Sequence, residues 1–139
     1  MPVGGQLPRG GYYSDRFVNN QALVVSEVRG TWRTARALPF PAGIGLVYSL
    51  ISSLSCPLPG NCSAGGFYSD ISGHKQAFVA SEVVGTWQAA VEVPGTAGLN
   101  AGGHAQVNSV SCGSAGDCSG GGVYSDSSAY GQGFIANTT

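Results

Sequence analysis

Four cysteines carry the clearest chemistry in this sequence, because they form two pairs with the same spacing. Five residues separate Cys56 from Cys62, and five separate Cys112 from Cys118. Cysteines at the two sides of a hairpin turn come close enough for a disulfide. Zinc and free thiols compete with this interpretation, but structural zinc sites favour closer spacing, and the pairs would have to meet across the structure. We predict two disulfides, each stabilising the fold by roughly 2 kcal/mol.

Disulfides are typical of oxidising compartments, so the cysteine pairs favour a secreted, extracellular protein. The first residues, Met1–Gly5, contain neither the charged nor the apolar region of a signal peptide. We expect either that an export signal has been removed or that the chain belongs to a longer one.

Three aspartates stand in copies of Tyr-Ser-Asp, at Asp15, Asp70 and Asp126. Carboxylates beside serine hydroxyls suit a small cation. An aspartate at the end of a strand more commonly accepts hydrogen bonds from the backbone amides of the following turn. The residues after the three aspartates differ and follow no calcium-loop spacing. We interpret the motif as a turn cap and predict neither a metal site nor a cofactor.

Five aromatic residues recur at equivalent positions and are candidates for facing a ligand: Tyr13, Tyr68, Tyr124, Trp32 and Trp87. In a groove, such rings stack on sugars or peptides. Repeated aromatics are more often part of the core between repeats, and we keep both interpretations.

No catalytic constellation is recognisable. His74 and His104 are isolated in glycine-rich turns, where we expect them to be exposed. A glycosidase needs two carboxylates in distinct environments, and the sequence does not establish such a pair. Glu27 and Glu82 occupy the same repeat position, which favours a structural role. We predict no catalytic residue.

Charge and hydropathy exclude two partners. Charged residues make up 9% of the 139 residues, and the net charge is −1. Without a basic patch, nucleic acid binding is not expected. No apolar run approaches the roughly 18 residues of a membrane helix.

These residues belong to an internal repeat, which predicts how they are positioned. Tyr-Ser-Asp recurs after 55 and then 56 residues, Gly-Thr-Trp after 55, and the cysteine pair after 56. Each copy predicts four short strands. In the second copy these are Ile51–Cys56, Cys62–Ser69, Gln76–Glu82 and Thr86–Val93, followed by a loop at Thr96–Gly103.

A four-stranded meander with a period of about 55 residues predicts an all-β fold of propeller-like antiparallel blades. A sandwich needs no sequence repeat, and a solenoid coil usually takes only about 20 to 30 residues. We expect one domain, 1–139, with a leading hairpin at 1–29 and blades at 30–84 and 85–139. A closed ring needs at least about four blades. These roughly two and a half repeats predict a homo-oligomer or a piece of a longer array.

Three stretches of the chain, Ser109–Cys118, Gln76–Trp87 and Val93–Gly103, resemble the repeat of large, Cys-paired, secreted repeat proteins of actinobacterial type. Gly65-Gly66 followed by Trp87 is more loosely similar to Kelch repeats. The resemblance implies a propeller and carries no catalytic residues. The chain departs from the family pattern in its first copy, where Met1 and Leu7 replace the cysteines.

The sequence therefore favours a non-enzymatic extracellular scaffold or binding module for glycan or protein ligands. Two alternatives remain: a glycoside hydrolase or lyase with a channel site shared between chains, and a self-assembling structural element.

One experiment tests the disulfides and the assembly together. We expect light scattering to give a mass above that of one chain, because open blade edges pair. We also expect titration of the unfolded, unreduced protein to find no reactive thiol. A strict monomer at micromolar concentration contradicts the assembly, and four reactive thiols contradict the disulfides.

Overall fold

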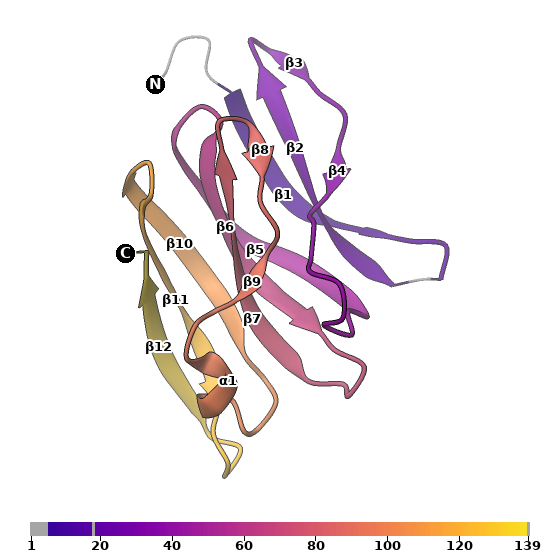
Figure 1. The fold of residues 1–139 in the computed structure, drawn as a ribbon, viewed down its shortest axis with the longest axis vertical. Helices are drawn as coiled ribbons and strands as arrows, with labels where there is room; N and C mark the ends of the chain where they lie inside the picture. Colours follow the sequence, from indigo (N-terminus) through magenta and orange to yellow (C-terminus); the bar gives the residue numbers. More distant parts are fainter. Residues whose placement is uncertain (1–5, 18, 139) are drawn as a thin grey trace.

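The computed structural model describes residues 6–17 and 19–138, with side chains from residue 9 onward. In this part the fold is all-β, with 60% strand and 3% helix. The strands form three antiparallel sheets, none of which closes into a barrel (Figure 1). The predicted all-β class is confirmed.

The first sheet contains β1 (Gln6–Ser14), β2 (Asn20–Val28), β3 (Thr31–Trp32) and β4 (Arg36–Ala37). β1 pairs with one edge of β2, and the two short strands pair with its other edge. β3 and β4 are therefore two pieces of one interrupted outer strand.

The second sheet repeats this plan with an additional first strand. It contains β5 (Tyr48–Leu58), β6 (Asn61–Ser69), β7 (Lys75–Val83), β8 (Thr86–Trp87) and β9 (Val91–Glu92). β5, β6 and β7 pair in sequence order, and both short strands pair with β7. β6 is equivalent to β1, and β7 is equivalent to β2.

The third sheet contains β10 (Gln106–Ser114), β11 (Asp117–Ser125) and β12 (Gly131–Asn137). Before it, the predicted loop contains a single helical turn, α1 (Thr96–Leu99). The three strands of the third sheet match the first three strands of the second sheet, β5, β6 and β7, in order and direction.

The sheets divide the chain differently from the blades predicted at 30–84 and 85–139. Thr31–Trp32 pairs with β2, and Thr86–Trp87 pairs with β7, so each outer strand belongs to the sheet before it. The reason is the turn. Arg29 and Gly30 have φ of 49° and 78°, and Val84 and Gly85 have φ of 48° and 83°. Two adjacent positive φ values make a two-residue hairpin that folds the next strand directly back.

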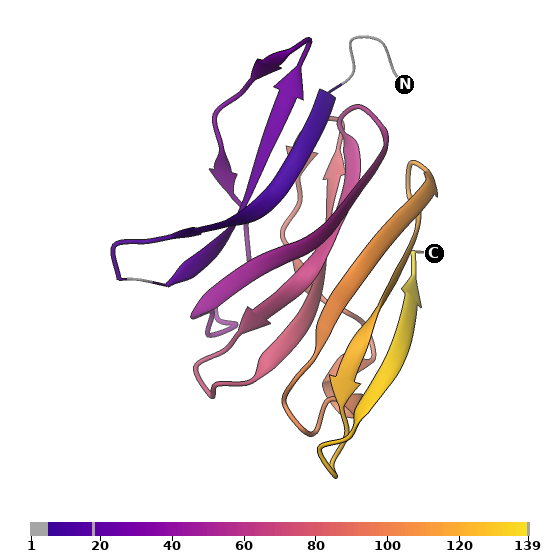
Figure 2. The same ribbon diagram turned by 180° about the vertical axis from the view of Figure 1, so that it is seen from behind.

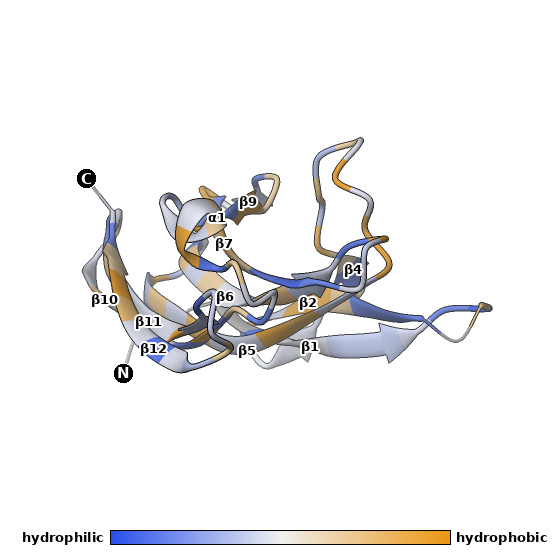
Figure 3. Ribbon diagram, turned by 90° about the horizontal axis from the view of Figure 1, so that it is seen from below, coloured by the Kyte–Doolittle hydropathy of each residue, from blue (hydrophilic) through white to orange (hydrophobic). Residues whose placement is uncertain are grey.

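The three sheets follow one another across the molecule with their faces in contact (Figure 3). Because successive side chains of a strand point to opposite faces, β7 supplies residues to two cores. Phe78 and Ala80 pack with Ala22 and Val24 of the first sheet. Ala77 instead packs with residues of the third sheet, which include Val107 and Val110.

Each sheet is joined to the next through its first strand. Figure 2 shows β1 (indigo), β5 (magenta) and β10 (orange) side by side. The amide of Val110 donates to Oγ of Ser53 at 3.0 Å, and the amide of Cys112 donates to Oγ of Ser55 at 3.1 Å. β5 thus pairs with its own sheet and also binds the next one through serine hydroxyls.

The glycine doublet of β6 makes this arrangement possible. A Cβ atom on Gly65 would lie 2.5 Å from Cγ1 of Val107, in the next sheet. A Cβ atom on Gly66 would collide with the carbonyl oxygen of Leu50, in the neighbouring strand β5. The absence of side chains therefore lets both neighbours approach, as expected for glycine inside a strand.

We expect Gly66→Ala to lower the free energy of unfolding by about 3 kcal/mol, because the methyl group meets backbone and not a flexible side chain. Gly113→Ala is the control, since a Cβ there meets nothing within 4 Å. Its effect should stay within about 0.5 kcal/mol. Urea unfolding measures both, and equal effects would contradict the close-approach explanation.

Candidate functional site

Both predicted disulfides are confirmed. Cys56–Cys62 and Cys112–Cys118 close the hairpins β5–β6 and β10–β11, with Cα atoms 4.1 Å and 4.0 Å apart. No described cysteine is free, so the competing zinc interpretation is wrong.

The two disulfides are consistent with an extracellular protein. Among the described residues, no helix is long and apolar enough to span a membrane.

Each Tyr-Ser-Asp aspartate caps the hairpin turn that follows it. Oδ1 of Asp70 accepts hydrogen bonds from the amides of Ser72 and His74 at 2.9 Å and 3.1 Å. Its Oδ2 accepts one from Nε2 of Gln76 at 3.3 Å. The same three bonds recur at Asp15, from Phe17, Asn19 and Gln21, and at Asp126, from Ser128, Tyr130 and Gln132.

These contacts confirm the turn-cap interpretation. The described residues contain no group of three or more His, Cys, Asp or Glu that could hold a metal ion. The glutamine six residues after each aspartate, at Gln21, Gln76 and Gln132, was the sequence signal for the complete cap. Both histidines are exposed, as expected.

The five recurring aromatics fall into three environments. Tyr68 is buried, and its ring meets that of Phe40 edge-on, with centroids 5.8 Å apart. Tyr124 is half-buried against the core between the second and third sheets. Tyr13 and Trp32 lie on the first sheet and are exposed, Trp32 to 51%.

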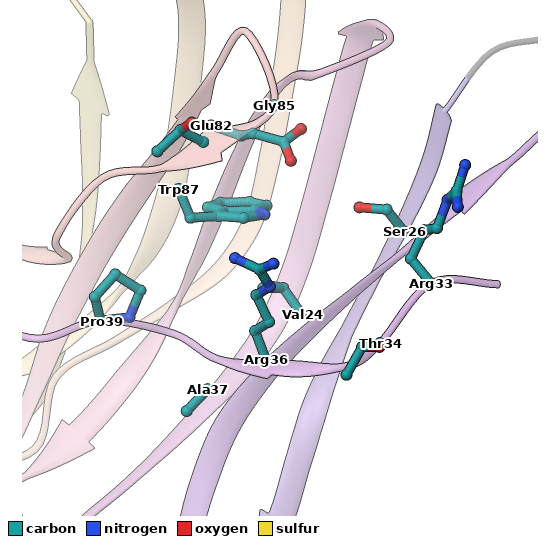
Figure 4. Close-up of a pocket in the computed structure, with 11 residues that line it drawn as sticks. Val24, Ser26, Arg33, Thr34, Arg36, Ala37, Pro39, Glu82, Gly85 and Trp87 are labelled. Carbon is teal, nitrogen blue, oxygen red and sulfur yellow. The ribbon is translucent and has the colours of Figure 1, made fainter.

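Trp87 lines a pocket of about 400 Å³ between the first and second sheets. Figure 4 shows the carboxylate of Glu82, the indole of Trp87 and the guanidinium of Arg36 turned toward one space, with Ser26 and Arg33 across it. The remaining walls come from β2, β4, β8, the turn before β8 and the segments on either side of β4: Val24, Thr34, Ala37, Pro39, Gly85 and Thr86.

The pocket has a distinctive electrostatic character. Two of the six basic residues of the chain, Arg33 and Arg36, line it together with one carboxylate. Glu82 is only 3% exposed, and burial raises the pKa of its carboxyl. Nε1 of Trp87 is covered and has no hydrogen-bond partner among the described residues. A buried donor without an acceptor costs about 1–3 kcal/mol.

The pocket is built where the repeat copies differ. Glu82 and Trp87 have counterparts in Glu27 and Trp32, but the arginines do not. The positions 55 residues after Arg33, Thr34 and Arg36 hold Gln88, Ala89 and Val91. Sequence reasoning named Trp87 as a candidate for facing a ligand, but it gave Glu82 a structural role and missed the arginines, because it followed the repeated residues. The sequence signal that could have indicated the site is that Arg33 and Arg36 are not repeated in the second copy.

The pocket is open to solvent. It combines the partly accessible indole of Trp87, two arginine side chains and the hydroxyl groups of serine and threonine. These groups can stack on a planar face and hydrogen-bond hydroxyl or carboxylate oxygens. In the described residues only Glu82 brings a carboxylate to it. No protein-family model matches the chain, and no curated protein matches it.

The aspartate caps predict an acid dependence of stability. Burial raises the pKa of Asp70, but its hydrogen bonds from Gln76, His74 and Ser72 outweigh burial, so this pKa lies below 3.8. The ionised cap therefore stabilises the fold above that value, and the stabilisation is lost as the pH falls through the lowered pKa. We expect Asp70→Asn to destabilise the protein near neutral pH.

Urea unfolding at several pH values measures this effect. The difference between wild type and Asp70→Asn should shrink as the pH falls below 3.8, the unperturbed value. A difference that is constant with pH would contradict the role of the ionised carboxylate.

Proposed function

We propose that this chain is a non-enzymatic, secreted binding module that holds a glycan in the pocket between its first two sheets. The observation that carries the proposal is the set of Trp87, Glu82, Arg33 and Arg36 around one open pocket of about 400 Å³. This volume lies in the range of small-molecule sites. The two arginines come from positions that differ between the copies, whereas Glu82 and Trp87 occupy repeated positions.

The lining favours a sugar that carries an acidic group. Two arginines line the pocket together with one carboxylate, so an anionic ligand meets more positive than negative charge. Guanidinium forks bind carboxylates in pairs of hydrogen bonds. The indole of Trp87 offers an apolar face on which a sugar ring can stack.

Catalysis is less well supported than binding. Hydrolysis of a glycosidic bond ordinarily uses two carboxylates about 5 to 9.5 Å apart. Glu82 supplies one, and the described lining of the pocket offers no second. A hydrolase or lyase would therefore need a carboxylate from another chain, which makes the enzyme the alternative proposal.

The scaffold in this proposal is a propeller-like array. Two observations support it: the sheets pack face to face, and their first strands lie beside one another. In this arrangement homo-oligomers or longer arrays continue the same packing beyond the outer sheets. The two disulfides support an extracellular setting, because disulfides form and persist in oxidising compartments.

A glycan array followed by calorimetry tests the binding site. We expect acidic glycans to bind, and Trp87→Ala or Arg36→Ala to weaken binding at least tenfold, about 1.4 kcal/mol. Trp32→Ala is the matched control, because Trp32 has the same repeat position but does not line the pocket. Its affinity should equal that of wild type.

The same measurements can overturn the proposal. An array on which no glycan binds, or binding that Trp87→Ala and Trp32→Ala reduce equally, contradicts a glycan site in this pocket. Turnover of a bound glycan, with loss of activity in Glu82→Gln, would favour the enzymatic alternative instead.

A further inference from the structure

Each of the three aspartate-capped turns carries one large apolar side chain that is exposed to solvent. Phe17 is 71% exposed, Ile71 82% and Tyr130 69%. They stand two, one and four residues after the aspartate of their turn, so the repeat does not fix them at one position. Turns ordinarily favour Gly, Pro, Asn, Asp and Ser. A large apolar residue in every copy is therefore not explained by the turn itself.

The three turns lie along one side of the molecule. Hairpins β1–β2, β6–β7 and β11–β12 all end there, whereas the disulfide-closed hairpins β5–β6 and β10–β11 end on the opposite side (Figures 1 and 2). Ile71 belongs to the middle sheet, which packs against a described sheet on each face, and it is the most exposed of the three. The exposure therefore belongs to the turns and does not arise from an outer sheet.

The caps hold these side chains in a fixed position. The amide of Phe17 donates to Oδ1 of Asp15 at 2.8 Å, and the amide of Tyr130 donates to Oδ1 of Asp126 at 3.0 Å. The turn of the middle sheet is capped in the same way. A group that is already held in place loses less freedom on binding. The carboxylates are also hydrogen-bonded within their turns, so an apolar surface can approach without leaving them unpaired.

The size and spacing of these side chains fit a lipid surface better than a protein partner. Aromatic side chains bury about 150–250 Å² each, so three side chains of this kind offer roughly 500 Å². A stable protein interface takes about 800 Å² from each partner. The apolar groups also stand on three separate turns and form no continuous patch. A bilayer surface has no fixed shape to match, and aromatic rings suit the level of its headgroups.

We propose that this side of the protein docks on the surface of a phospholipid bilayer, with Phe17, Ile71 and Tyr130 inserted at the level of the headgroups. Attachment of this kind is peripheral and needs no membrane-spanning segment. The proposal is independent of glycan binding, because the three turns and the pocket share no residue.

The charges at these turns are nearly balanced. The turns and the residue after each of them hold the three capping aspartates together with Arg16, His74 and Lys75. The guanidinium of Arg16 lies over the ring of Phe17, 5.1 Å from its centroid, so this charge stays beside the apolar group. Without an excess of positive charge, insertion of the apolar side chains must supply the affinity. We therefore expect a neutral lipid to be sufficient.

Sedimentation of the full chain with vesicles of synthetic phosphatidylcholine tests the proposal, because these vesicles carry neither sugar nor net charge. We expect saturable binding that persists in about 1 M salt, where the Debye length falls to about 3 Å. Ile71→Ser should weaken binding at least fivefold, because Ile71 is the most exposed and stands on the middle turn. Phe17→Ser and Tyr130→Ser should each weaken it at least threefold.

Val84→Ser is the matched control. Val84 is 83% exposed, nearly the same as Ile71, but it follows the other end of β7, in the turn before β8. Its substitution should leave vesicle binding unchanged. Both side chains are exposed, so both variants should fold, and circular dichroism checks this.

Three outcomes overturn the proposal. The first is a wild-type chain that does not sediment with the vesicles, and the second is an equal loss of binding in Val84→Ser and Ile71→Ser. The third is a variant with all three serines that changes the native mass and not the vesicle binding, because the turns then pair with a second copy. None of these outcomes affects the glycan pocket, which is assayed with a different ligand and with Trp87→Ala.

Discussion

The close approach of neighbouring strands to the glycines of β6 is the constraint on which the fold depends. Gly66 lets β5 pair in its own sheet, and Gly65 admits Val107 of the next sheet. The same doublet therefore serves the pairing within a sheet and the packing between sheets. The composition of the chain, with 23 glycines and 9% charged residues, is consistent with strands that approach one another closely. Both faces of the middle sheet are covered, because Phe78 packs toward the first sheet and Ala77 toward the third.

Stacking also decides what each repeated residue does. Trp32 and Trp87 have the same sequence position, yet one is 51% exposed and the other lies against the segment that follows β4. Ile135 is 79% exposed, although its equivalent in the middle sheet, Val79, packs against the third sheet. A repeat position has no fixed environment, because its surroundings belong to the neighbouring sheet.

The pocket illustrates how a binding surface arises in a repeated fold. The pocket appears where the first copy departs from the second, with Arg33 and Arg36 in place of Gln88 and Val91. Divergence between copies therefore supplies chemistry on a framework that the repeat builds.

The sequence by itself determined the all-β class, the repeat, the two disulfides, the turn-capping aspartates and the central strands of each copy. These features rest on local chemistry and on the repeat: cysteines across a hairpin, aspartates one turn from amides, and motifs that recur after 55 or 56 residues. Tertiary structure decided which sheet each outer strand joins, because Arg29-Gly30 and Val84-Gly85 adopt positive φ and turn the chain back at once. It also decided that Glu82, Trp87 and Arg36 share a pocket, because they come from two sheets whose contact no repeat period records.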